Sequence, residues 1–188
     1  MSLPLVRLVV LCVALFFAIV ALGLGAAVES ATETLEDLSF AYASLAIAAA
    51  VLTLLSVGPM VALELLRPGG PASWLWVEIS VLLVLSILWL ATGGATANVL
   101  QVLNEFGYCT AGVTGAGGGA GESLCGETQG VAAMGFLSWL LLMGYAGMLL
   151  VVGIQAASRG QSDVWTTSVA DLGYLQPPVA KKPNSDRV

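Results

Sequence analysis

Residues 79–103 read ISVLLVLSILWLATGGATANVLQVL, and this stretch decides the fold because it contains no charged residue. A helix needs about 20 consecutive apolar residues to cross roughly 30 Å of hydrocarbon. Three further charge-free stretches are long enough, namely 8–28, 40–63 and 128–158. A closed β-barrel is the other structure whose backbone groups are all hydrogen-bonded within lipid, and its strands alternate apolar and polar residues. Runs such as Leu140-Leu141-Leu142 do not alternate, so we expect four membrane-spanning helices.

The composition of the whole chain supports this interpretation. Of the 188 residues, 58% are apolar and 10% are charged, whereas soluble domains contain about 45–50% apolar and 25% charged residues. We therefore predict an all-α integral membrane four-helix bundle over residues 1–158, with spans at about 8–28, 40–66, 74–103 and 128–157. Residues 159–188 are more polar and include three prolines, and we expect a largely disordered cytosolic tail.

The residue types that are missing exclude several functions. The chain has no histidine, which removes bis-histidine haem carriers and imidazole metal sites. The basic residues form no patch, so there is no footprint for nucleic-acid binding. No two catalytic groups are placed to converge, and we expect no cofactor, no metal and no enzymatic activity.

The positions of the basic residues predict the orientation of the chain. Arg7 precedes the first span, Arg67 lies between the second and third, and the other four bases follow residue 158. The connections 29–39 and 104–127 contain acids but no Lys or Arg. The positive-inside rule then places both termini in the cytosol. We expect the protein in the plasma membrane or a secretory-pathway membrane.

Two cysteines lie in the connection 104–127, on the side opposite the bases. Because that side is oxidising in secretory membranes, we expect Cys109 and Cys125 to form a disulfide; the alternative is two free thiols. The segment between them is rich in glycine and should have no regular structure of its own. Cys12 stands alone in the first span.

Four charged residues lie near the ends of the spans and could form ion pairs there. Glu64 precedes Arg67 by three residues, a spacing that allows pairing on one helix. Glu78 lies about one turn inside the third span, where it either pairs with Arg7 of the first span or extends to the cytosolic surface. A transport role for Glu78 is a third alternative, since ionisable groups within spans are functional candidates.

Small and aromatic residues in the spans are candidates for helix packing. Small residues let helices approach closely in a membrane, and aromatic residues deep in a span pack between helices. The small candidates are Ala21, Gly25, Gly93, Gly94 and Gly144. The aromatic candidates are Trp89, Phe136 and Trp139.

Four features of the chain occur together: four predicted spans, predicted cytosolic termini, a first outer loop without cysteine and a cysteine pair in the second outer loop. Residues 89–92, Trp-Leu-Ala-Thr, end the deep part of the third span, and residues 132–140 contain a Phe-x-x-Trp spacing. With these features the chain resembles the MARVEL-domain tetraspan membrane proteins, many of which have the same Phe-x-x-Trp spacing. The resemblance covers roughly residues 5–157.

Other tetraspan families match less well. Claudin-like proteins carry a Trp…Cys…Cys signature in the first outer loop, and tetraspanins carry Cys-Cys-Gly in the second; both signatures are absent. The MARVEL resemblance implies a role in membrane organisation or trafficking, with lipids, other membrane proteins or a second copy as partners. The alternatives are an accessory subunit of a larger membrane complex and a transporter or channel that uses Glu78.

Overall fold

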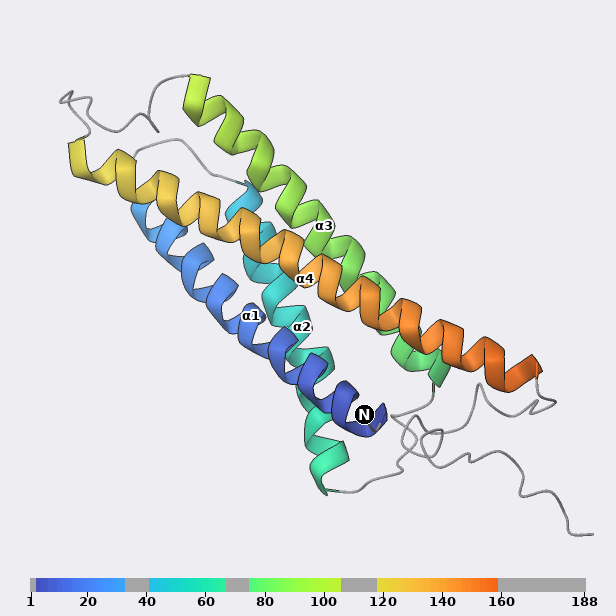
Figure 1. The fold of residues 1–188 in the computed structure, drawn as a ribbon. Helices are drawn as coiled ribbons and strands as arrows, with labels where there is room; N and C mark the ends of the chain where they lie inside the picture. Colours follow the sequence, from blue (N-terminus) through green and yellow to red (C-terminus); the bar gives the residue numbers. More distant parts are fainter. Residues whose placement is uncertain (1–2, 33–40, 67–74, 106–117, 159–188) are drawn as a thin grey trace, which may run out of the picture.

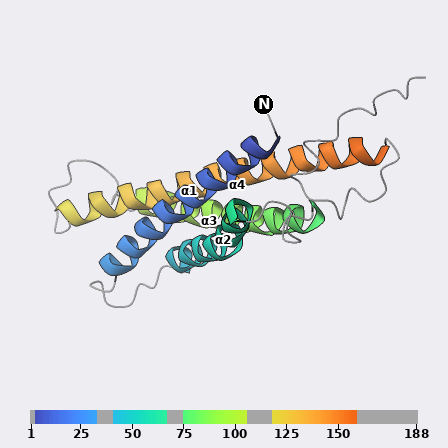
Figure 2. The same cartoon turned by 90° about the horizontal axis from the view of Figure 1, so that it is seen from below.

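A computed structural model describes residues 3–32, 41–66, 75–105 and 118–158, and all of them are helical. The four helices are α1 (Leu3–Thr32), α2 (Ala41–Leu66), α3 (Leu75–Glu105) and α4 (Gly118–Ser158). They run up and down in one elongated bundle, with the start of α1 and the end of α4 at the same end (Figures 1 and 2). The predicted all-α four-helix architecture is confirmed.

Each helix is long and apolar enough to cross a membrane. The lengths of 30, 26, 31 and 41 residues all exceed the roughly 20 that a span requires. Large apolar side chains point outward: more than half of the surface of several is exposed, as at Phe16, Leu55, Ile87 and Leu140. Several polar side chains, among them Arg7, Thr53 and Glu78, are instead buried, the reverse of a soluble bundle, and the chain is a multi-pass membrane protein.

The fourth helix differs from expectation at its start. It begins at Gly118, about ten residues before the expected boundary at 128, so Cys125 lies within the helix. Gly130 and Thr128, in the next turns, contact Leu24 of α1 and Tyr42 of α2. The early start runs against the poor helix propensity of the glycines in the first turns. Cys109 and the tail 159–188 lie outside the described residues.

The buried positions of α1 follow a regular repeat. They are spaced alternately four and three residues apart, and comprise Arg7, Leu11, Ala14, Ala18, Ala21, Gly25 and Val28. A spacing of 3.5 residues is that of helices that wrap around one another with a left-handed crossing. The stripe is made mainly of small residues, which lets α1 approach α2 and α4 closely.

The helices contact one another in a ring. The α3–α4 contact is the most extensive, α1–α2 and α1–α4 follow, and α2–α3 is the least extensive of the four. Pro59 lies inside α2, where it removes one backbone hydrogen bond and bends the helix. The last turns of α2 run off the line of the other helices in both views (Figures 1 and 2).

Candidate functional site

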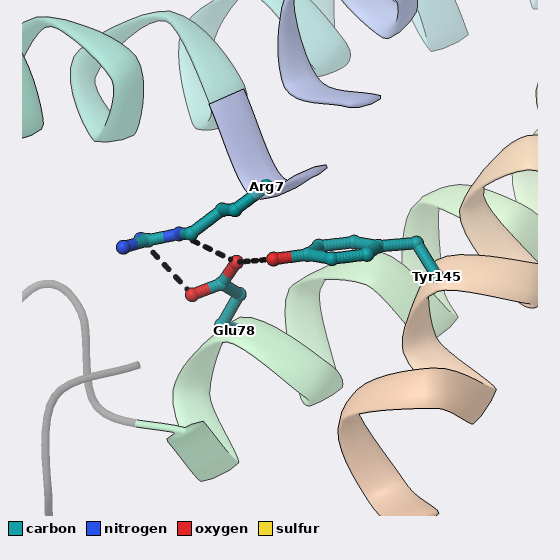
Figure 3. Close-up of polar contacts among 3 residues, drawn as sticks. All are labelled: Arg7, Glu78 and Tyr145. Carbon is teal, nitrogen blue, oxygen red and sulfur yellow. Dashed lines mark hydrogen bonds and ion pairs between the residues drawn. The ribbon is translucent and has the colours of Figure 1, made fainter. Parts of the chain in front are cut away.

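Three polar side chains meet at the end of the bundle where α1 and α3 begin and α4 approaches its end (Figure 3). Arg7 Nε donates to Glu78 Oε1 at 3.0 Å, and Arg7 Nη2 lies 3.0 Å from Glu78 Oε2. Tyr145 Oη donates to the same Oε1, also at 3.0 Å. The guanidinium therefore contacts both carboxylate oxygens, and three helices are joined through one carboxylate.

The helix faces explain why these polar residues turn inward. Arg7 occupies the first position of the buried stripe of α1. Glu78 belongs to the buried stripe of α3, one turn before Leu82, and Tyr145 to that of α4, one turn before Leu149. Arg7 and Glu78 are 1% and 0% exposed. Each side chain has to find its partner inside the bundle, because its position on the helix directs it there.

The electrostatics of this site require the pair to stay together. Removing two charges from water is costly, and their attraction compensates only when the geometry is good and the remaining donors and acceptors are satisfied. Arg7 contacts both carboxylate oxygens of Glu78 at 3.0 Å, and Tyr145 adds a donor to Oε1, so the geometry favours the pair. Of the alternatives for Glu78, the structure has the pairing with Arg7 and not the extension to the surface.

The second expected ion pair lies outside the region that can be examined. Arg67 is not among the described residues, and nothing is described of the Glu64 side chain. Pairing of Glu64 with Arg67 therefore stays a prediction.

A second link between helices lies midway along the bundle. The Trp89 indole Nε1 of α3 donates to Thr53 Oγ1 of α2 at 3.0 Å, and that hydroxyl donates in turn to the backbone oxygen of Ala49 at 2.7 Å. Trp89 is the largest of the fully buried side chains. The placement of Trp89 agrees with its expected packing role, and its indole also makes a polar contact.

A third link lies at the opposite end of the bundle. Tyr42 Oη of α2 and Thr128 Oγ1 of α4 are 3.1 Å apart, and both side chains are buried. Sequence reasoning missed this pair. The sequence does place these two polar residues in the first turn of the second and fourth spans, on the same side of the membrane. Nothing in the sequence pairs one with the other.

The backbones of α3 and α4 approach each other closely at Gly93 and Gly135. A Cβ added at Gly135 would lie 2.8 Å from the Gly93 Cα and 2.9 Å from its nitrogen. A Cβ added at Gly93 would meet Phe136 at 3.3–3.4 Å. Gly93 thus lies in the contact between α3 and α4, whereas its partner Gly135 was not among the candidates.

Two glycine candidates make no helix contact within the bundle. Gly94 and Gly144 are exposed, and an added Cβ at either would meet nothing within 4 Å. Gly94 directly follows the contact residue Gly93, and Gly144 directly precedes the buried Tyr145. One residue rotates a helix by about 100°, which turns a neighbour of a contact position outward.

The remaining packing candidates differ in how far their side chains are buried. Ala21 and Gly25 are buried on α1, and a Cβ at Gly25 would lie 3.1 Å from Ile47 of α2. Trp139 is partly buried against the core, and Phe136 is 38% exposed although its ring covers Gly93. These residues belong to helix contacts and to the outer surface rather than to a ligand cavity.

Comparison with known proteins identifies the fold family. The family model for MARVEL, the membrane-associating domain, matches residues 4–148, a range that includes the four helices down to Met148 of α4. Neither the curated proteins nor the solved structures gave a significant match. The matched range spans most of the chain, contains Arg7, Glu78 and Tyr145, and agrees with the four membrane-spanning helices. The chain belongs to the MARVEL family.

Proposed function

We propose that this protein is a non-enzymatic organiser of membrane domains that supports trafficking by packing against lipids, partner proteins or a second copy of itself. One observation carries the proposal: the buried charges are matched to each other inside the bundle, while large apolar side chains cover its outside. Such a bundle offers the bilayer an extended contact surface.

The main alternative is an accessory subunit of a larger membrane complex. Affinity purification of the full chain in mild detergent, followed by quantitative mass spectrometry, separates the two. Self-association or co-enrichment of several membrane proteins and lipids is expected. Recovery of one partner at a fixed stoichiometry would instead support the role of accessory subunit and contradict that of organiser.

A transporter that uses Glu78 is a second alternative, and the geometry disfavours it. Conduction needs a carboxylate that can exchange protons or ions, whereas Glu78 is fully buried and held by Arg7 and Tyr145. Purified protein in liposomes should support no proton or cation flux above protein-free liposomes. A flux that disappears in the Glu78→Gln variant would overturn the proposed organiser role.

The orientation belongs to the same proposal. Arg7 is neutralised by Glu78, so the positive-inside argument rests on the five bases at Arg67 and beyond residue 158. These bases still favour cytosolic termini in the plasma membrane or a secretory-pathway membrane. Epitope tags at both ends should resist protease in intact cells, and cleavage of either tag before permeabilisation would reject this orientation.

A further inference from the structure

A shallow groove of about 250 Å³ runs along the outside of the bundle between α2 and α3. Leu52 and Ser56 of α2 form one wall, and residues of α3 from Ser80 to Leu88 form the other. Leu85, which is 3% exposed, lines its buried side, while Leu52 and Val84 are 45% and 59% exposed at its edges. The groove lies along the least extensive helix contact of the ring.

The groove lies at the depth of the hydrocarbon. Leu52 is ten residues into the span that begins at Tyr42, which is about 15 Å along the helix axis. Val84 is nine residues into α3, about 14 Å from its start. Both distances are close to half of the roughly 30 Å hydrocarbon thickness. Whatever fills the groove must therefore be a component of the membrane interior.

The lining offers no donor or charge to a polar ligand. Ser56 Oγ donates to the Leu52 backbone oxygen at 2.7 Å, and Ser80 Oγ donates to the Trp76 backbone oxygen at 2.8 Å. Both hydroxyls are thus engaged within their own helices. Transmembrane helices commonly associate through interhelical hydrogen bonds and small residues. The other lining residues are Leu and Val, so the groove offers a second helix neither kind of contact.

The size of the groove restricts the occupant further. One turn of a helix with its side chains is about 10–12 Å wide and 5.4 Å long, more than a groove of about 250 Å³ can enclose. Clefts for compact, drug-sized molecules measure about 300–1,000 Å³, which is larger than this groove. A flexible hydrocarbon chain is narrow enough and requires only dispersion contacts.

We propose that the groove between α2 and α3 binds one acyl chain of a phospholipid, lying lengthwise between Leu52 and Val84. The acyl chain contacts both helices along the least extensive of the four helix contacts. A lipid held in this way should co-purify with the protein under mild conditions. Binding of the acyl chain does not depend on association between bundles. An experiment can therefore disprove the acyl-chain site without disproving the organiser role, and the reverse.

The test uses the full chain in phosphatidylcholine nanodiscs that contain a lipid with a photoactivatable acyl chain. Crosslinks mapped by mass spectrometry should concentrate on 52–56 and 80–88 and be sparse at equally exposed positions such as Phe16 and Ile154. The double variant Ser56→Leu/Ser80→Leu fills the groove and should lose this excess. The matched control Ala91→Leu/Ala133→Leu adds the same kind of side chain at exposed positions outside the groove and should keep it.

Several outcomes would overturn the acyl-chain site. These are labels spread evenly over all exposed apolar positions, an excess that survives in the filled variant, and stronger labelling of the groove by a photoactivatable sterol. Crosslinks between two copies of the chain at 80–88 would assign the groove to self-association instead. If the filled variant does not fold, the distribution of labels on the unaltered chain decides alone, and an even distribution rejects the site.

Discussion

Arg7 and Glu78 lie 71 residues apart in sequence, yet two contacts of 3.0 Å join them inside the bundle. Their helices, α1 and α3, each pack mainly against α2 and α4 rather than against each other. The ion pair therefore crosses the middle of the ring. Tyr42 and Thr128 connect the other two opposite helices, α2 and α4, at the far end. The two links fix the order of the four helices.

Breaking the ion pair should destabilise the bundle strongly. Glu78→Gln leaves the buried Arg7 guanidinium without a counter-charge, and loss of one partner of a buried pair costs about 3–5 kcal/mol. The double variant Arg7→Met/Glu78→Leu removes both charges and keeps most of the volume, so it should recover most of the loss. Reversible unfolding in detergent micelles, followed by circular dichroism, gives these differences.

A matched control comes from the other end of α3. Glu105 is exposed, and Glu105→Gln should leave the unfolding transition unchanged. If Glu78→Gln unfolds like Glu105→Gln, the pair does not hold the helices together. If the double variant is no more stable than Glu78→Gln, lost packing rather than an unpaired charge is responsible.

Tyr145→Phe should produce a smaller loss through the same carboxylate. The change removes one donor to a charged acceptor, a bond worth about 1.5–3 kcal/mol. Because the bond goes to Glu78 Oε1, the effect should shrink in the Glu78→Gln background. A double-mutant cycle measures this coupling. Equal effects of Tyr145→Phe in both backgrounds would mean that the hydroxyl acts elsewhere.

Two glycines on α4 should respond in opposite ways to the same substitution. In Gly135→Ala the new Cβ would lie under 3 Å from the Gly93 backbone, so α3 and α4 must separate, at a cost of about 1–3 kcal/mol. Gly144→Ala meets open space and should be neutral or stabilising by up to about 1 kcal/mol through helix propensity. Thermal unfolding of both variants checks this contrast, and similar midpoints would contradict it.

These glycines also mark what the sequence could and could not predict. Four spans follow from charge-free length alone, and that part of the fold was predictable. The repeat of small and apolar residues from Leu11 to Val28 fixes the buried face of α1, and extending it by one step reaches Arg7. Which helix lies opposite that face is a property of the tertiary arrangement. Opposite charge and similar depth were enough to name Arg7 as a partner for Glu78, but nothing in the sequence brings Tyr145 to the same carboxylate.

Two packing candidates were chosen by composition without helical phase, and they make no contact within the bundle. Gly94 and Gly144 were chosen because they are small, although each lies one residue away from a contact position. Gly135 was overlooked, but it lies at the same 3.5-residue spacing as the buried Val131, Ser138 and Leu142 of α4. The start of α4 at Gly118 could not be anticipated, because glycine propensity points the other way.

The link between Tyr42 and Thr128 should be weaker than the ion pair. Interhelical hydrogen bonds between neutral groups in membranes average about 0.6 kcal/mol. Tyr42→Phe and Thr128→Val should each lower the stability by about this amount, and the double variant should lose little more than either single one. Unfolding measurements on the three variants decide this, and fully additive losses would show that the two hydroxyls do not depend on each other.

The cysteine chemistry gives the last prediction. Cys12 is a free, exposed thiol, whereas Cys125 begins the turn that leads to Thr128 and is expected to pair with Cys109. In denaturant, maleimide should therefore modify one thiol per chain before reduction and all three cysteines after it. Cys125→Ser should lower stability by about 3 kcal/mol and expose a second thiol, at Cys109, without reduction. Cys12→Ser, the matched control, should leave no reactive thiol in the unreduced protein. Three thiols modified without reduction would reject the disulfide, and they would remove the argument that this end of the bundle faces an oxidising compartment.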